Sequence, residues 1–177
     1  MLDKKLFTVS VFGLAAVLIE DAVRIMLNIR TDQDHQWKIA GSDPISGVFI
    51  VDCPGGGVLP ADKDLASALR RQIIVETGGC DIVQLGKFMG PIPYFNLNPK
   101  LPSDLAFWTP IRLIRQPKPS DEAFDHPWVS REEFEADAPF RCVSALGNKG
   151  RTGQMVRAAF EFFEANANLS HYFCTTQ

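Results

Sequence analysis

The sequence has few of the residues that build disulfide frameworks and zinc centres. Its 177 residues include four cysteines, and no two of them form a C-x-x-C pair. The three histidines show no metal-ligand spacing either. A structural zinc site and a disulfide framework are therefore disfavoured. Widely spaced, reduced thiols are typical of a cytoplasmic protein, which is the location that we expect.

Four further features are missing, and each excludes a class of protein. There is no G-x-S-x-G elbow, and the glycine loop at residues 147–153 lacks the G-K-[ST] ending of a P-loop. The net charge is −3 and no dense block of lysine and arginine occurs, so we expect no nucleic-acid partner. The apolar run at residues 6–19 is too short for a membrane span and favours a strand, so we expect no membrane partner.

The composition that remains is that of one globular domain. Hydrophobic residues make up 46% of the chain and charged residues 22%, which predicts a single domain over residues 1–177. The pattern of apolar stretches and turns predicts mixed α and β structure. We expect strands at residues 14–19, 23–30, 37–39, 49–52, 82–89 and 105–114, loops at 90–104 and 116–127, a short helix from Arg131 and a closing helix within 147–166. Pro110 predicts an edge position or a bulge for the last strand.

Residues 54–79 join a glycine-rich turn to an amphipathic helix. Leu65, Leu69 and Ile73 recur every four residues and so form one apolar stripe. Asp62 or Asp64 is suited to cap the start of this helix, and a glycine pair at residues 78–79 is suited to end it. The turn presents backbone groups and the helix presents side chains.

This stretch resembles the Nudix box, whose pattern is G-x5-E-x7-R-E-U-x-E-E-x-G-U, with U an aliphatic residue. In the family, the glutamates hold Mg²⁺ or Mn²⁺ and place a water against a diphosphate. The positions aligned with the pattern are Gly57 for the first glycine, Lys63 for the first glutamate, Arg71 for the arginine, and Gln72, Ile73, Val75, Glu76 and Gly78 for those that follow. The spacing is kept, but three of the four glutamates are replaced, so the box is degenerate.

Helical geometry shows what the replacements change. Positions 72, 75 and 76 are three and four residues apart and therefore share one face of the helix. They carry Gln72, Val75 and Glu76, which provide one amide oxygen, no ligand atom and one carboxylate. Mg²⁺ prefers octahedral oxygen coordination with one or two carboxylates. We therefore expect Mg²⁺ or Mn²⁺ to bind weakly, with Glu76 and Gln72 as the metal ligands and Glu76 as a catalytic residue.

Other acidic residues offer two alternatives for completing the site. If the loop is counted from Gly56, Asp62 falls at the spacing of the first glutamate, although helix capping is the role that we favour for an aspartate there. An acidic residue from the distant loop at 116–127, Asp121 or Glu122, is the second alternative. Some Nudix enzymes keep a catalytic glutamate in this region, so the resemblance makes Glu122 our second catalytic candidate.

Ligand contacts are expected from the box and from nearby aromatic residues. The box candidates are the backbone of Gly56 and Gly57 and the side chains of Arg71 and Gln72. Three aromatic residues around the proline-rich loop, Tyr94, Phe95 and Trp108, are candidates for stacking a nucleobase. Burial in the core is the alternative for Trp108, and for Trp37 we expect a core or rim position.

The resemblance implies an α/β fold, the Nudix-type α/β/α sandwich with a mixed central sheet. It also implies a nucleoside-diphosphate-linked ligand, of which ADP-ribose is an example. Our first hypothesis is binding of such a ligand with impaired or absent metal-dependent pyrophosphohydrolase activity. The alternatives are an active pyrophosphohydrolase with a rearranged metal site and a protein-interaction module; the edge strands leave a homodimer open.

Overall fold

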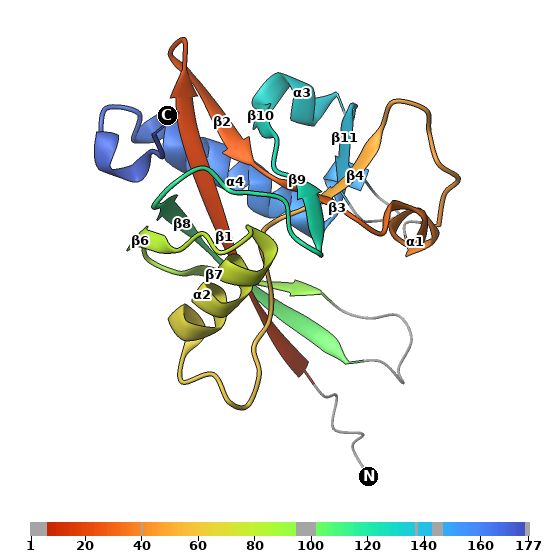
Figure 1. The fold of residues 1–177 in the computed structure, drawn as a ribbon, viewed down its shortest axis with the longest axis horizontal. Coiled ribbons are helices and arrows are strands. Elements are labelled where there is room, and N and C mark those ends of the chain that lie inside the picture. The colour runs from red at the N-terminus through yellow and green to blue at the C-terminus, as the bar shows by residue number, and fades with distance from the viewer. Residues whose placement is uncertain (1–6, 40, 95–101, 137, 143–146, 176–177) are drawn as a thin grey trace.

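The computed structural model describes residues 7–39, 41–94, 102–136, 138–142 and 147–175. The elements are β1 (Phe7–Ile19), β2 (Ala22–Met26), β3 (Asn28–Arg30), α1 (Gln33–Ile39), β4 (Phe49–Asp52), β5 (Gly55–Gly57), α2 (Leu65–Glu76), β6 (Ile82–Leu85), β7 (Met89–Tyr94), β8 (Ser103–Leu113), β9 (Ala123–Asp125), β10 (Trp128–Ser130), α3 (Arg131–Glu135), β11 (Phe140–Cys142), η1 (Gly147–Lys149), α4 (Arg151–Ala165) and η2 (Ser170–Tyr172). Figure 1 shows their arrangement.

The strands form two mixed sheets. The larger sheet has seven strands in the order β10-β2-β1-β8-β6, with β5 added to β1 and β7 added to β8. Its central pair, β1 and β8, is parallel, whereas the other pairs are antiparallel. The smaller sheet has the order β11-β4-β3-β9, and only its β11–β4 pair is parallel. The α/β class with mixed sheets is confirmed, with two sheets among the described residues where we expected one central sheet.

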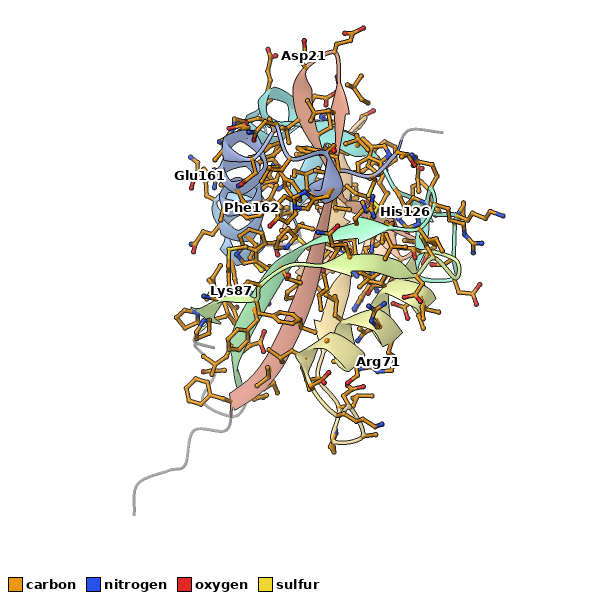
Figure 2. The ribbon with its side chains drawn as sticks, turned by 90° about the vertical axis from the view of Figure 1, so that its left-hand side faces the viewer. Asp21, Arg71, Lys87, His126, Glu161 and Phe162 are labelled. Atoms are coloured by element: carbon orange, nitrogen blue, oxygen red, sulfur yellow. The ribbon has the colours of Figure 1, made fainter. Side chains whose placement is uncertain are left out.

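Strand β1 separates the two halves of the core. Because successive side chains of a strand point to opposite faces, its odd and even residues enter different clusters. Leu14 and Ala16 pack with Phe160 and Phe163 of α4, whereas Val17 packs in the cluster of α2. Figure 2 shows this layering, with Glu161 and Phe162 of α4 on one side of β1 and Arg71 of α2 on the other. A helix on each side of the sheet confirms the expected α/β/α layering.

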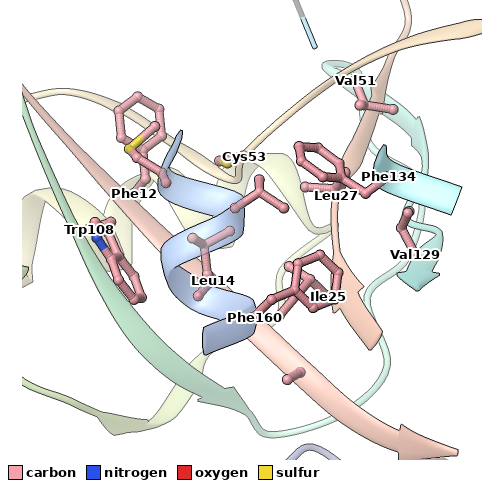
Figure 3. Close-up of a cluster of buried hydrophobic side chains, with 14 of the residues drawn as sticks. Phe12, Leu14, Ile25, Leu27, Val51, Cys53, Trp108, Val129, Phe134 and Phe160 are labelled. Atoms are coloured by element: carbon pink, nitrogen blue, oxygen red, sulfur yellow. The ribbon is translucent and has the colours of Figure 1, made fainter. Parts of the chain in front are cut away.

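The cluster between β1 and α4 is the larger one and contains most of the aromatic core. Figure 3 shows Phe12, Trp108, Phe134 and Phe160 gathered around α4 and β1. Phe134 and Phe160 are fully buried, with ring centroids 6.2 Å apart. Burial of a phenylalanine side chain contributes about 1.5–3 kcal/mol relative to exposure. This cluster therefore fixes α4 and the short helix α3 to the larger sheet.

Helix α2 begins and ends where the sequence predicts. Asp64 is its N-cap: the Asp64 carboxylate accepts from Ser67 N at 2.7 Å, and Ser67 Oγ accepts from Asp64 N at 3.0 Å. Gly78 follows the C-cap with a φ of +61°, which favours glycine. Leu69 and Ile73 of the predicted stripe are fully buried. The capping box of Ser130 and the closing helix, observed as α4, are confirmed too.

The strand predicted at residues 37–39 is wrong. These residues end helix α1, which is anchored at Asp32 by bonds from His35 N, Gln36 N and Gln36 Nε2. These local hydrogen bonds determine that the segment is helical. With seven residues, it is too short for helical or strand periodicity to be informative. Trp37 is only 3% exposed and packs with Ile50, so its placement in the core is confirmed.

The region from residue 82 to 104 also differs from the prediction. Strand β6 ends at Leu85, β7 occupies part of the expected loop, and β8 begins at Ser103. Among the described strands β7 pairs only with β8, and an edge strand tolerates its prolines. Strand β8 is not an edge strand, so that alternative for Pro110 is wrong. Pro110 O accepts from Gly86 N at 2.9 Å, and the proline ring packs against Gly86, which lies between β6 and β7.

Candidate functional site

The glycine turn of the box lies against β1 and α2. Strand β5 pairs with residues 10–12 of β1, and Gly55 has a φ of +143°. A Cβ atom on Gly55 would lie 2.2 Å from Val11 O, so the backbone approach allows no side chain. A Cβ atom on Gly56 would lie 2.6 Å from Gln72 Nε2. The backbone of β1 therefore requires glycine at position 55, whereas a side chain at position 56 would displace the flexible end of Gln72.

Arg71 ties the loop that follows this turn to α2. Its Nε and Nη2 donate to the two carboxylate oxygens of Asp62 at 3.0 and 2.7 Å, and Nη2 also donates to Gly57 O at 3.1 Å. Leu59 N donates to the same carboxylate at 2.7 Å. The hydrogen bonds from Arg71 lower the pKa of Asp62 to about 2. Both oxygens of Asp62 are thus engaged in holding the loop, which leaves it poorly placed to complete a metal site.

The three residues at the former glutamate positions do not converge on one point. Gln72 Nε2 lies 3.5 Å from Gly57 O, and the side chain of Val75 is 48% exposed. Glu76 is only 3% exposed and turns inwards. Its Oε2 accepts from Gly55 N and from Asn28 Nδ2, both at 2.9 Å. Glu76 therefore joins the glycine turn to β3.

A chain of hydrogen bonds continues from Glu76 into the segment after β9. Asn28 Oδ1 lies 2.8 Å from His126 Nδ1, and His126 Nε2 lies 3.0 Å from Lys118 O. Burial is the main cause that raises the pKa of Glu76 to about 8, and the bond from Gly55 N opposes it. Burial also lowers the pKa of His126, which Figure 2 shows on the same side of β1 as Arg71. Both buried groups therefore favour their neutral forms.

Strand β3 supplies the cation of this region. Arg30 Nη1 lies 4.0 Å from Glu76 Oε1 and 3.6 Å from Glu122 Oε2, and Arg30 Nε lies 3.7 Å from Asp32 Oδ1. Thr31 N donates to Glu122 O at 3.1 Å, which holds the Glu122 backbone beside β3. The Arg30 guanidinium therefore contacts both Glu76 and Glu122, the second acidic candidate.

Sequence reasoning did not identify Asn28, Arg30 or His126 as part of this site. Asn28 and Arg30 are alternate residues of one strand and so point to the same face, towards Glu76. A signal was present in the sequence, because a polar residue within a predicted buried strand requires a hydrogen-bond partner. The sequence does not say which partner.

The described residues do not fit a divalent metal ion. No group of three or more histidine, cysteine, aspartate or glutamate side chains suited to a metal occurs in the part of the chain that the structure describes. Glu76 Oε2 already accepts two hydrogen bonds, and the Arg30 guanidinium lies between Glu76 and Glu122. A cation bound there would meet a fixed positive charge at close range.

A second polar cluster lies where β1, β7, β8 and α4 meet. Arg151, the first residue of α4, forms an ion pair with Asp104, which also accepts from Ser10 Oγ at 2.9 Å and from Thr8 Oγ1 at 3.0 Å. The Arg151 guanidinium lies 5.3 Å from the ring centroid of Tyr94, and Tyr94 is 50% exposed. Tyr94 and Arg151 thus form a partly exposed platform of the kind that stacks planar groups.

The other two aromatic candidates are not part of this platform. Trp108 is 3% exposed and packs edge-on against Phe162, with ring centroids 6.5 Å apart. It has no free face for a nucleobase, because core side chains cover the ring. Phe95 lies outside the described residues. Tyr94 is the aromatic candidate that we retain.

Asp52 connects the two clusters electrostatically. Burial raises the pKa of Asp52, and both Arg30 and Arg151 act in the opposite direction. Both arginines are therefore close enough to this carboxyl group to interact with it. Asp52, the last residue of β4, is thus within electrostatic range of Arg30 and of Arg151.

Similar solved structures identify this arrangement of elements. The MutT protein from Methanosarcina mazei Go1 shares 22% identity over 93% of this chain and 97% of its own, with a TM-score of 0.57. The E. coli ORF135 protein shares 17% identity over 94% and 96%, with a TM-score of 0.55. The NUDIX domain of Shewanella oneidensis NrtR, solved with ADP ribose, shares 10% identity over 88% and 87%, with a TM-score of 0.54.

Comparisons at the level of sequence find less. No protein-family model matches this chain, and no curated protein matches it. At identities of 22% and below, the likeness to solved structures concerns the fold and not the chemistry of the site. None of the described helices is long and apolar enough to cross a membrane.

Proposed function

We propose that this protein, which has the fold of Nudix hydrolases, binds a nucleoside-diphosphate-linked ligand and hydrolyses it poorly or not at all. The observation that carries the proposal is the state of the box. Its backbone frame is kept, with Gly55 and Gly56 packed against β1 and α2, while its acidic face is not. Gln72, Val75 and Glu76 provide a single carboxylate, and that carboxylate is buried and hydrogen-bonded within the protein.

The geometry suits binding at two ends of a ligand. The Tyr94–Arg151 platform is half exposed and offers an aromatic face for a nucleobase, for which stacking contributes about 1–3 kcal/mol. Arg30, on β3, offers guanidinium donors for phosphate oxygens. The NrtR domain from Shewanella oneidensis was solved with ADP ribose, a ligand that combines both groups. ADP-ribose is therefore the first probe that we would use.

The same geometry is poorly suited to hydrolysis. An attacking water needs a base or a metal to activate it, and each such group typically contributes on the order of 10²- to 10³-fold in rate. With a pKa of about 8, Glu76 is mostly neutral at pH 7, and its oxygens face Asn28, Gly55 and Arg30. Val75 offers no proton acceptor at all. We therefore propose that any residual turnover is several orders of magnitude below that of a complete box.

The test is product analysis with the pure protein. It is incubated with ADP-ribose, NAD⁺, dinucleoside polyphosphates and nucleoside triphosphates, in Mg²⁺, in Mn²⁺ and in chelator, and the products are separated by chromatography. Glu76→Gln serves as the control for contaminating hydrolases. We expect no metal-dependent cleavage, and calorimetry with the same compounds should then find one that binds. If none binds, the interaction-module alternative is favoured.

One observation favours the second candidate function, an active pyrophosphohydrolase with a rearranged metal site. Glu122 Oε2 is 3.6 Å from the guanidinium that also faces Glu76, so two carboxylates lie near the box. If Arg30 moved away on substrate binding, both would become free for a metal. Metal-dependent cleavage that disappears in both Glu76→Gln and Glu122→Gln would establish this function and overturn the one that we propose.

A further inference from the structure

Arg30 lies among three carboxylates that come from three different parts of the chain. Glu76 is on α2, Glu122 precedes β9, and Asp32 precedes α1. The distances from the guanidinium nitrogens are 4.0, 3.6 and 3.7 Å, respectively. A single positive charge thus contacts acidic side chains that are 2, 46 and 92 residues away from Arg30 in the sequence, at Asp32, Glu76 and Glu122. This is the arrangement of a cation and its ligands, with a side chain as the cation.

These contacts are ion pairs and not hydrogen bonds. All three distances exceed the usual range of about 2.7–2.9 Å for a charged nitrogen that donates to a carboxylate. Arg30 Nε is buried and has no hydrogen-bond partner within the described ranges. The side chain is 25% exposed and Glu122 is 40% exposed. Arg30 Nη1, which meets Glu122 only at 3.6 Å, can therefore form a shorter bond with a stronger acceptor that approaches from the side of Glu122.

A guanidinium differs from a divalent ion in ways that matter here. It stays charged at every pH at which the protein is folded, it cannot be removed by a chelator, and its planar donors match phosphate oxygens in pairs. Glu122 can give way because it is half exposed, whereas Glu76 is fixed by Asn28 and Gly55. A diphosphate group that replaced Glu122 would gain shorter bonds and release a carboxylate into water.

We propose that Arg30 is the built-in cation of this site, which takes the place of a divalent ion between Glu76 and Glu122 and binds the diphosphate of the ligand directly. This inference rests on the proposed function, because it assigns the residue that holds the ligand's phosphates. Its consequence is that ligand binding requires no metal. Glu122 acts as the displaceable counter-ion of Arg30 in the free protein.

Calorimetric titration with ADP-ribose tests the binding half of the inference. The affinity should agree within about twofold between Mg²⁺ and EDTA. Arg30→Gln should weaken it by about 10- to 100-fold, as expected for loss of hydrogen bonds to a charged group. Arg24→Gln is the matched control, since Arg24 lies on β2 and pairs with Glu133 at 3.3 Å. The affinity of this variant for ADP-ribose should equal that of the wild type.

Glu122→Gln separates the inference from a metal-based site by the sign of its effect. Removal of the counter-ion frees Arg30, so ADP-ribose should bind about 2- to 5-fold more tightly in EDTA, the range for a partly exposed ion pair. If Glu122 were a metal ligand, the same variant would bind more weakly in Mg²⁺, and EDTA would abolish binding in the wild type. Either of these results would overturn the inference.

Titration with Mn²⁺, followed by electron paramagnetic resonance, tests the other half without any ligand. At pH 8.5, where Glu76 is ionised, the wild type should show no saturable site, whereas Arg30→Gln should gain one because three carboxylates lose their cation. Arg30→Lys keeps the positive charge and should therefore show no saturable Mn²⁺ site. It is the variant to compare with the wild type if Arg30→Gln melts below the assay temperature. A saturable Mn²⁺ site in the wild type would overturn the inference. If the wild type does not bind ADP-ribose but Arg30→Gln gains a Mn²⁺ site, the proposed ligand is wrong, whereas the role of Arg30 as the internal cation is supported.

Discussion

Glu76 is the residue whose substitution separates a buried structural carboxyl group from a metal ligand. It is 3% exposed, and it is held by Asn28 Nδ2 and Gly55 N, each at 2.9 Å. Burial raises its pKa from 4.5 to about 8. The folded protein therefore keeps this proton at pH values where the unfolded chain has lost it. Glu76→Gln removes the ionisation while it preserves the size of the side chain.

The raised pKa makes wild-type stability fall as the pH rises. The contribution of Glu76 is fully present below pH 4.5, decreases through the interval from 4.5 to 8, and has been lost above it. At about 1.4 kcal/mol per pH unit, this loss is about 3 kcal/mol at pH 7 and approaches about 5 kcal/mol above pH 8. The Glu76→Gln variant has no ionisable group at this position, so its stability does not fall with pH for this reason. Its free energy of unfolding relative to wild type should therefore rise by about 3 kcal/mol between pH 5.5 and 8.5.

Urea unfolding of both proteins at pH 5.5, 7.0 and 8.5, in EDTA, measures this difference. Comparison of the two proteins removes the contribution of His126, whose lowered pKa makes stability rise with pH below 6.5 in both. The reasoning is refuted if the difference between the variant and the wild type is constant with pH, or if wild-type stability relative to Glu76→Gln increases with pH. Either outcome would mean that the folded protein prefers the ionised carboxylate.

Three further predictions follow from the contacts of single residues. Asp64→Ala should lower the melting temperature, whereas Asp64→Asn, which keeps a capping oxygen, should lower it less in the same thermal scan. Trp108→Ala should destabilise the protein by about 3–5 kcal/mol in urea unfolding, because the Trp108 ring is in the core. Tyr94→Ala should change the free energy of unfolding by less than about 0.5 kcal/mol, because Tyr94 is half exposed, and it should weaken ADP-ribose binding. Gly55→Ala should destabilise strongly, since its Cβ would lie 2.2 Å from Val11 O; a melting temperature equal to that of wild type would show that the turn can move.

The parts of the fold that the sequence predicts are those with local signals. Helix α2 is bounded by a capping aspartate and a glycine at positive φ, and its stripe has a regular period. Helix α1 was missed because a seven-residue segment contains too few turns for periodicity, and its start depends on bonds to Asp32. Strand β7 was missed because its prolines indicate a loop, whereas its position at an edge of the sheet, a property of the tertiary structure, permits them.

The candidate site is predictable only in its helical part. The spacing of residues 72, 75 and 76 gives their common helix and the loss of carboxylates. It does not give the burial of Glu76, because its partners Asn28 and Gly55 lie 48 and 21 residues away. Arg30 meets Glu76 and Glu122 only after β3, α2 and the start of β9 have been brought together. Contacts of this kind have no periodic trace in a single sequence.

The most direct test of the central claim, that the site binds a diphosphate ligand without metal and leaves it intact, is one ³¹P NMR experiment. ADP-ribose is observed with a slight excess of protein in EDTA, and again over several hours after Mg²⁺ is added beyond the chelator. The account predicts a shift or broadening of both diphosphate resonances in EDTA and no monophosphate resonances after Mg²⁺. Unchanged resonances in EDTA, or monophosphate resonances that appear with Mg²⁺ and are missing with Glu76→Gln, would contradict it.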